Sequence, residues 1–526
     1  MTFSFFSQSS ARLNTTPSNV IGLLNSLALS LLMLAVITPA VLANDHVLPV
    51  LTQGMIDRFR TSLDGATWVE QPDHVLYRSS EQKWNRLLRD TLSLPNWVEL
   101  SVQHRTRFES VSHPWRHGQL GDTDMQIPQR THVRLGVTKG PFSFLFEGID
   151  GHTSAQTLPN DFNGSYLVNH ADILQLFVSA TFRDTLGTGI RTDAHIGRFT
   201  FEFGSTRLVG RHLYLNATQA YDGIHVHISK PNQWKVRAFL TEPVHIRPTD
   251  LDTQSANRLF WGTTGEFRQL PWIVVGPYYL GLHDSVSSTR RVINTYGLRI
   301  HKAPTNPDFF NLLDEEESSL LNGSLGFDYE LEVTIQTGTR GEKDFFAQMG
   351  YAQAGYTLNM TWYPRFAAEY QYASGTNNPG GSQSQTFDSL FGIRRFDLME
   401  PGLFGPFARS NISSPGWRFV VKPRRDLQIF LKQRFWYLAQ AKDAFIGSNQ
   451  PGVAALQDAT GSSGNYLGHD LELAAIWWVN TNLILEAGYD HWFKGSYFDR
   501  LPASAGLPLG STKDSDYFYV SMQLRL

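Results

Sequence analysis

The amino-acid sequence predicts an all-β fold: an antiparallel, up-and-down transmembrane β-barrel. Three observations support this fold class. Long segments alternate apolar and polar residues with a period of two, aromatic residues gather near the ends of these segments, and the connections between them are alternately long and short. In lipid every backbone N–H and C=O must be paired, so a sheet that spans a membrane has to close on itself.

Composition limits the classes of function. The chain has 526 residues, no cysteine and a formal net charge of −3. Without cysteine it can form no disulfide and no thiolate metal site, and a nearly neutral chain is not expected to bind nucleic acid. Only 41% of its residues are hydrophobic, which suits a transmembrane barrel because lipid-facing and lumen-facing residues alternate along each strand.

The N-terminus has the features of a secretory signal peptide. Arg12 precedes an apolar stretch from about residue 20 to residue 37, and the small-residue pattern Val41-Leu42-Ala43 follows. We expect cleavage after Ala43, so that residues 1–43 are removed on export. The alternative is a membrane-anchoring helix, since the apolar stretch is long enough for one.

Residues 44–96 differ in pattern from the rest and are interpreted as an N-terminal extension on the periplasmic side. The stretch SEQKWNRLL (80–88) has helical spacing and follows a possible serine N-cap. Pro95 is expected to end this short helix because proline lacks the backbone N–H.

From residue 97 to residue 526 the alternation predicts barrel strands. In WVELSVQHRTRFES (97–110), Arg105 and Arg107 share one face with glutamates, and the other face is mainly apolar. The same pattern recurs over 191–204, 234–241 and 325–338. These segments are nearer the ~9–11 residues of a tilted spanning strand than the ~5–6 residues of a strand in a soluble protein.

The last segment, DYFYVSMQLRL (516–526), explains why the chain can end on a strand. Phe518 and Val520 lie on its apolar face, while Tyr517 and Arg525 lie on its polar face. We expect this strand to pair with the first strand and to close the barrel, with the apolar face in lipid and the polar face in the lumen.

Connection lengths predict the orientation. The connections at about 374–414, 440–466 and 494–515 are long, and those between them are short. Long extracellular loops and short periplasmic turns produce this pattern in outer-membrane barrels. An exception is 302–323, a long connection on the predicted periplasmic side, whose acidic run 314–317 is interpreted as a solvated segment.

Several motifs also occur together in a fixed order. They include GRFTFEFGSTRLVGRHLYLNATQAYDGIHV (197–226), FDYELEVTIQTG (327–338), PRFAAEYQYASG (364–375), GHDLELAAIWW (468–478) and LEAGYDHWFKGSYF (485–498). In this combination the chain, from about 97 to 526, resembles the alginate export family of outer-membrane proteins. The resemblance implies a single barrel of about eighteen strands that exports an anionic uronate polysaccharide, although family members need not all carry alginate.

A channel for a polyuronate needs cations that attract carboxylates without trapping the chain. Arginine suits this role because its guanidinium binds carboxylates through two parallel hydrogen bonds and stays charged. From alternation and the resemblance, the predicted pathway residues are Arg105, Arg107, Arg134, Arg198, Arg207, Asp222, Arg237, Glu330, Glu332, Arg365 and Arg434. The alternative is that these charges brace neighbouring strands, and that Arg207 and Asp222 fix a loop.

The sequence therefore predicts an outer-membrane channel for passive export of an anionic, alginate-like polysaccharide. A porin for uptake of small anionic solutes is the alternative. Expected partners are this cargo, outer-membrane lipids and a periplasmic export scaffold. The connection 374–414 is a candidate lid over the mouth.

Neither a cofactor nor a metal site nor catalytic residues are predicted. His225 and His227 share one strand face, but the sequence ties no third ligand to them. A hydrolase would need a nucleophile, a base and an orienting group together, and Asp490-His491 alone does not supply them. The protein is therefore not expected to be an enzyme.

Overall fold

The computed structural model describes the chain from residue 87 to residue 526, with gaps at 115–122, 156–166, 213, 231–232, 256, 271–272, 286–289, 303–325, 396, 400–403, 425, 446–455, 481 and 503–511. The predicted signal peptide, the extension up to residue 86 and the acidic run 314–317 lie outside the described residues. Of the helix predicted at 80–88, the structure describes α3 (Leu87–Thr91), which ends before Pro95.

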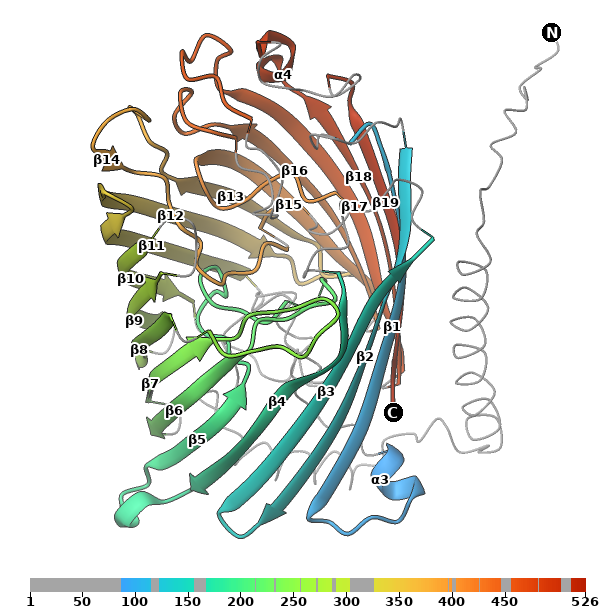
Figure 1. Cartoon of the computed structure of the whole chain (residues 1–526). Coiled ribbons are helices and arrows are strands. Elements are labelled where there is room, and N and C mark those ends of the chain that lie inside the picture. Colours follow the sequence, from blue (N-terminus) through green and yellow to red (C-terminus); the bar gives the residue numbers. More distant parts are fainter. Residues whose placement is uncertain are drawn as a thin grey trace, which may run out of the picture. The chain divides into compact units, whose positions relative to one another are not determined.

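The described strands form one sheet that closes into a barrel (Figure 1). β1 (Val98–Ser112) pairs antiparallel with β2 (Thr123–Lys139) on one side and with β19 (Ser515–Arg525) on the other. Of the 19 strands, β14 (Gln383–Ser384) has only two residues and pairs in parallel with β12 (Lys343–Thr357). The wall therefore has 18 strands in the part of the chain that the structure describes, and the predicted closed barrel is confirmed.

The other wall strands follow one another round the barrel in chain order. They are β3 (Phe142–Ser154), β4 (Asn169–Phe182), β5 (Arg191–Phe199), β6 (Tyr221–Lys230), β7 (Trp234–Pro243), β8 (Arg258–Leu270), β9 (Ile273–Asp284), β10 (Arg291–His301), β11 (Gly326–Arg340), β13 (Arg365–Ala373), β15 (Ile412–Arg424), β16 (Leu427–Tyr437), β17 (Tyr466–Asn480) and β18 (Leu483–Lys494). Short helices occur at η1 (Thr185–Gly187) and α4 (Ser496–Arg500). Among the described helices, none has the length and apolar character needed to cross a membrane.

Side chains alternate between the outer surface and the interior, as the sequence predicts. On β11 the outward Leu331 and Val333 are 48% and 59% exposed, whereas the inward Glu330 and Glu332 are buried. On β19 the outward Phe518 is likewise exposed. In a soluble protein apolar side chains lie inside and polar ones outside, and here the distribution is reversed. The outer surface of a spanning barrel contacts lipid, while the polar groups inside contact one another or water.

On β5 the two faces are opposite to the prediction. Phe199 is buried in the apolar cluster of the interior, while Ile196 on the other face is 55% exposed. Arg198 lies opposite Leu176 of β4 and Asp222 of β6, on the outer side of the wall. The predicted lumen positions of Arg198 and Asp222 are therefore wrong. The reason is that the interior behind β5 is filled with apolar side chains, so the phenylalanines point inward.

Two connections fold into the barrel and touch each other there. The first inner segment, residues 200–220, joins β5 to β6, and the second inner segment, residues 374–411, joins β13 to β15. Val209 of the first forms a parallel bridge with Phe391 of the second, and the backbone N–H of Gly210 donates to the carbonyl of Phe391 over 3.2 Å. The connection predicted as a candidate lid thus folds inward, but as one of a pair.

The inner segments share a hydrophobic core with the inward face of the wall. Phe404 and Phe407 of the second inner segment are buried against Trp492 of β18, and Phe407 stacks on Trp436 of β16 with ring centroids 4.0 Å apart. Tyr214 of the first inner segment packs edge-on against an inward tyrosine of β19. Burial of such aromatic surface is worth several kcal/mol, so the segments are held in the barrel by packing as well as by charge.

Candidate functional site

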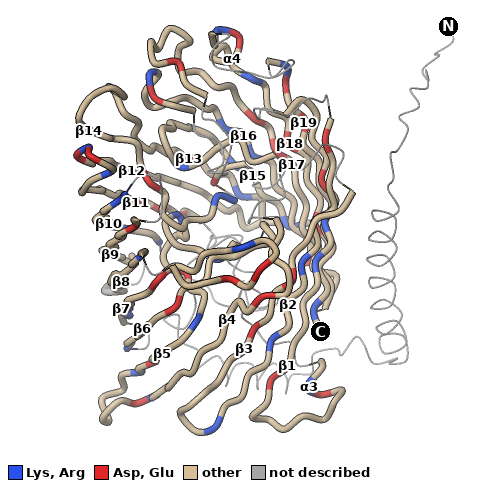
Figure 2. Tube along the Cα trace, in the orientation of Figure 1, with Lys and Arg blue, Asp and Glu red and all other residues tan. Residues whose placement is uncertain are grey.

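The charged interior of the barrel is the candidate functional site. Figure 2 shows basic and acidic residues interleaved along the wall rather than separated onto different sides. The structure places nine of the eleven predicted pathway residues in the interior: Arg105, Arg107, Arg134, Arg207, Arg237, Glu330, Glu332, Arg365 and Arg434.

Arg207 joins the two inner segments to the wall. Its Nη1 lies 2.6 Å from Oε1 of Glu330 and 2.9 Å from Oε2 of Glu332, both on β11. Its Nε lies 2.7 Å from Oδ2 of Asp397 in the second inner segment. The guanidinium also lies over the ring of Tyr351 of β12, 3.4 Å from the centroid. Three carboxylates from two different elements therefore converge on one buried arginine.

Asp397 is bound by a second arginine as well. Nη2 of Arg409 lies 3.0 Å from Oδ2 of Asp397, and its Nη1 donates to the carbonyl of Arg207 over 3.0 Å. Burial alone would lower the pKa of Arg207, but the carboxylates of Asp397 and Glu330 raise it well above its usual value. Burial lowers the pKa of Arg409 to about 10. Both guanidinium groups stay charged at neutral pH and need an anionic partner.

A second group of arginines on β1 and β2 binds the first inner segment. Nη2 of Arg105 donates to Oδ1 of Asn216 over 2.9 Å, and Nη1 of Arg130 donates to the carbonyl of Leu215 over 2.9 Å. Nη1 of Arg107 donates to the carbonyl of Tyr214 over 2.6 Å. These interactions hold residues 214–216 against a strip of basic wall. They use neutral oxygens, which a carboxylate could replace with a stronger, charge-assisted hydrogen bond.

Other interior charges brace the wall, as the alternative interpretation proposed. Arg365 of β13 binds both oxygens of Asp328 of β11, at 3.0 and 2.7 Å. Arg434 of β16 lies 3.1 Å from Glu369 of β13. These pairs connect strand to strand and involve neither inner segment.

The remaining predicted residues connect the wall to the first inner segment. Arg134 of β2 lies 3.2 Å from Glu147 of β3, which also accepts from Arg211 of the first inner segment over 2.7 Å. Arg237 of β7 donates to the carbonyl of Glu202 over 2.6 Å. The first inner segment is therefore fixed to wall strands on both sides of β5 and β6, the strands that it joins.

Sequence reasoning missed several interior arginines: Arg130 on the wall, Arg211 on the first inner segment, and Arg395 and Arg409 on the second. Arg130 could have been found, because it lies two and four residues from His132 and Arg134 and so shares their face of β2. The others lie in connections, where no strand period indicates which way a side chain points.

Arg198 and Asp222 form part of a cleft on the outer side of the wall instead. Nε and Nη2 of Arg198 lie 2.8 and 3.0 Å from the two oxygens of Asp222. The connection between β7 and β8 lies against this pair, with the carbonyl of Asp252 3.3 Å from Nη1 of Arg198. The cleft has a volume of about 630 Å³ and is lined by exposed apolar residues such as Leu176 and Ile196.

The contact between this connection and β4 is expected to weaken as the pH rises. The backbone N–H of Asp252 donates to Oδ2 of Asp172 over 2.6 Å. Burial, together with the nearby carboxyl of Asp172, raises the pKa of Asp252 to about 7. A released aspartate titrates near about 4. The protonated Asp252 therefore stabilises the docked state below about pH 4, and this contribution is lost between about pH 4 and pH 7.

Hydrogen exchange measures this effect. The protection factor of the Asp252 amide, corrected for intrinsic exchange, is expected to fall at least about tenfold from pH 5 to pH 8. In Asp252→Asn the protection should not change with pH over this range. Protection that rises with pH in the wild type would contradict the assignment.

A family model described as alginate export matches residues 96–506. No curated protein matches the chain significantly.

Solved structures with the same fold include three outer-membrane proteins of Pseudomonas aeruginosa. The outer membrane protein opdK is 11% identical with a TM-score of 0.53, over 82% of this chain and 98% of its own. OccK3 (OpdO) is 12% identical with a TM-score of 0.51, over 84% and 99%. OccD3 (OpdP) is 10% identical with a TM-score of 0.50, over 82% and 91%. At these identities the similarity concerns the barrel fold alone.

Proposed function

The chain belongs to the alginate export family and forms an outer-membrane channel, and from this premise we propose that it exports an anionic polysaccharide of the uronate type. The observation that carries the proposal is the shared buried arginine. Arg207 binds two carboxylates of the wall and one, Asp397, of the second inner segment. A carboxylate of the cargo matches Asp397 in charge and geometry.

Passage then takes place by exchange of carboxylates. When a uronate carboxylate replaces Asp397 on Arg207 and Arg409, neither guanidinium is left without an anion, and the second inner segment moves so that the released Asp397 carboxylate reaches water in the channel. This matters because leaving a buried charge unpaired costs about 3–5 kcal/mol, whereas exchanging one carboxylate for another avoids this loss. Arg105 and Arg107 of β1 offer further guanidinium groups to the cargo; they bind oxygens of residues 214–216, and Arg107 also pairs with Glu109. Several sites of moderate strength allow the polymer to advance without being trapped.

The proposal also includes the route by which the channel reaches its membrane. Residues 1–43 act as a cleaved signal peptide, and residues 44–96 form an extension on the periplasmic side. A periplasmic export scaffold would deliver the polymer to this side of the barrel. The outward apolar face, with Leu331 and Val333 as examples, supports contact with outer-membrane lipids.

Block of the channel by oligosaccharides tests the proposal. In planar bilayers, oligouronates are expected to block the ionic current at a concentration at least about tenfold lower than neutral oligosaccharides of the same length, because each charge-assisted hydrogen bond contributes about 1.5–3 kcal/mol. Arg105→Gln should weaken this block. Arg198→Gln is the matched control, since Arg198 faces outward and should leave block unchanged.

Two results would count against export of a uronate polymer. If neutral oligomers block as well as charged ones, the interior does not select for carboxylates. If small anions pass with strong selectivity while oligouronates neither block nor pass, uptake of small anionic solutes is the better description.

A further inference from the structure

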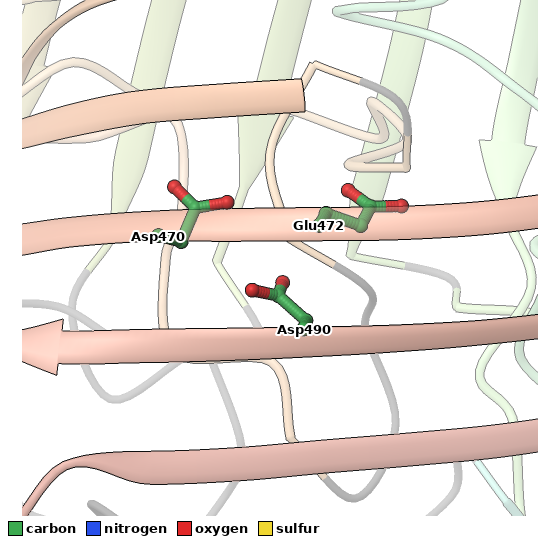
Figure 3. A group of neighbouring side chains, drawn as sticks. All are labelled: Asp470, Glu472 and Asp490. Carbon is green, nitrogen blue, oxygen red and sulfur yellow. The ribbon is translucent and has the colours of Figure 1, made fainter. Parts of the chain in front are cut away.

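A group of three carboxylates lies on the inner face of the wall, on two neighbouring strands (Figure 3). Asp470 and Glu472 come from β17, and Asp490 comes from β18, where it pairs directly with Glu472. All three are buried, with exposures of 0%, 1% and 1%. Each offers one carboxylate oxygen such that all three atoms lie within 4.8 Å of one another. The sequence predicted no metal site, because only the strand register brings these residues together.

The group carries more negative than positive charge. Lys432 of β16 forms an ion pair with Glu472, and its Nζ also donates to the carbonyl of Leu398 over 3.3 Å. Arg434 lies opposite Asp470 but binds Glu369. The three carboxylates thus lie close together beside Lys432, with Arg434 opposite Asp470 on the neighbouring strand. Buried carboxylates are strongly disfavoured unless a cation neutralises them.

An independent observation indicates that a ligand belongs here. Nε1 of Trp436 donates to Oδ1 of Asp470 over 2.5 Å. Oδ2 of Asp470 is fully buried and makes no hydrogen bond to the protein. Trp436 lies opposite Gly468, on the side of Asp470 away from Glu472. Because Oδ1 is bound on the side of Trp436, Oδ2 is turned toward the other two carboxylates and has an unused lone pair. Figure 3 shows the three carboxylate groups next to one another.

We propose that Asp470, Glu472 and Asp490 bind one calcium-like divalent cation in the wall of the channel. Such hard cations take oxygen ligands at about 2.3–2.6 Å with flexible geometry. Two oxygens that each lie about 2.4 Å from one ion are at most about 4.8 Å apart, so a single ion can contact all three carboxylates. Its positive charge offsets the mutual repulsion of three neighbouring buried carboxylates. Water or a cargo oxygen completes the coordination.

The site also contacts the second inner segment. Lys432 holds the carbonyl of Leu398 of that segment while it pairs with Glu472. A cation bound between Asp470 and Asp490 therefore fixes the part of the wall against which the segment rests.

Terbium luminescence provides a direct test, using the full mature chain in detergent. Tb³⁺ replaces Ca²⁺ at oxygen sites, and excited tryptophan transfers energy to it at short range. Trp436, hydrogen-bonded to Asp470, is in place to do so. We expect saturable terbium emission on tryptophan excitation that Ca²⁺ displaces. Asp490→Asn and Asp470→Asn should each weaken Tb³⁺ binding at least about tenfold.

Glu486→Gln is the matched control. Glu486 lies on the same strand and face as Asp490 but forms its own ion pair with Arg395, so its replacement should leave terbium binding unchanged. Ca²⁺ should also raise the Tm of the wild type and of Glu486→Gln, but not that of Asp490→Asn. If Asp470→Asn does not fold, Asp490→Asn and Glu472→Gln give the same comparison. Absence of sensitised emission, or emission equal in wild type and Asp490→Asn, overturns the proposal.

Discussion

Replacing Arg207 by alanine is expected to open the channel. The substitution leaves Glu330, Glu332 and Asp397 buried without the cation that they share. Removing one partner of a buried ion pair costs about 3–5 kcal/mol, which corresponds to a change of about 10²- to 5 × 10³-fold in the ratio of seated to released inner segments. Single-channel recording in planar bilayers should show higher mean conductance and longer open times than the wild type.

Arg365→Ala provides the matched control for this experiment. Arg365 is equally buried, and it binds Asp328 through two hydrogen bonds. That pair joins β13 to β11 and does not involve an inner segment. Its loss should lower the melting temperature but leave the conductance near the wild-type value. Equal conductance changes in the two variants would show that loss of any interior charge opens the barrel, and that Arg207 has no special role.

Gly392→Val is expected to separate the two inner segments by steric contact alone. A Cβ added at Gly392 would lie 1.8 Å from the carbonyl oxygen of Arg207 and 2.4 Å from its carbonyl carbon. Both are backbone atoms, so one segment has to move. The bridge between Val209 and Phe391 lies beside this contact. We therefore expect this bridge to break.

A cysteine reporter detects this movement, since the chain has no cysteine of its own. Val209 is 0% exposed, so V209C should react slowly with a maleimide. Combining V209C with Gly392→Val should raise the rate of maleimide labelling at least about tenfold, because overpacking costs about 1–3 kcal/mol and favours separation of the two inner segments. Gly380→Ala is the control in the same segment, because its Cβ would meet only Oδ1 of Asn378 at 3.8 Å. If V209C is still labelled slowly in the Gly392→Val background, the two inner segments adjust to the added side chain but remain in contact.

The wall of the barrel was predictable because a strand has a simple period. Alternation predicted Arg105 and Arg107 of β1 and Glu330 of β11 on the inner face, and in the structure these side chains are buried. The same rule failed at Arg198, because the interior behind this end of β5 is filled by apolar side chains rather than by water. Near Phe199 the interior is as apolar as the outside, so polarity no longer distinguishes the two faces.

The inner segments could not be derived from the sequence in the same way. Their order comes from contacts between residues that are far apart in the chain, such as Arg207 with Asp397 and Tyr214 with Tyr517. Neither segment has a repeating pattern, and the position of Gly392 has meaning only once its neighbour across the junction is known. The acidic group at Asp470 was hidden for the same reason, since its members lie on two strands.

The two inner segments leave and re-enter the sheet at one rim. Residues 200–220 run from the end of β5 to the start of β6, and residues 374–411 run from the end of β13 to the start of β15. Neither inner segment has to pass through the closed barrel from the other rim. The eighteen-stranded barrel can therefore close by pairing β1 with β19 before the inner segments fold inside it. Biogenesis can therefore proceed in two stages: the barrel wall forms first in the membrane, and the two inner segments then fold within it, much as a small soluble domain folds.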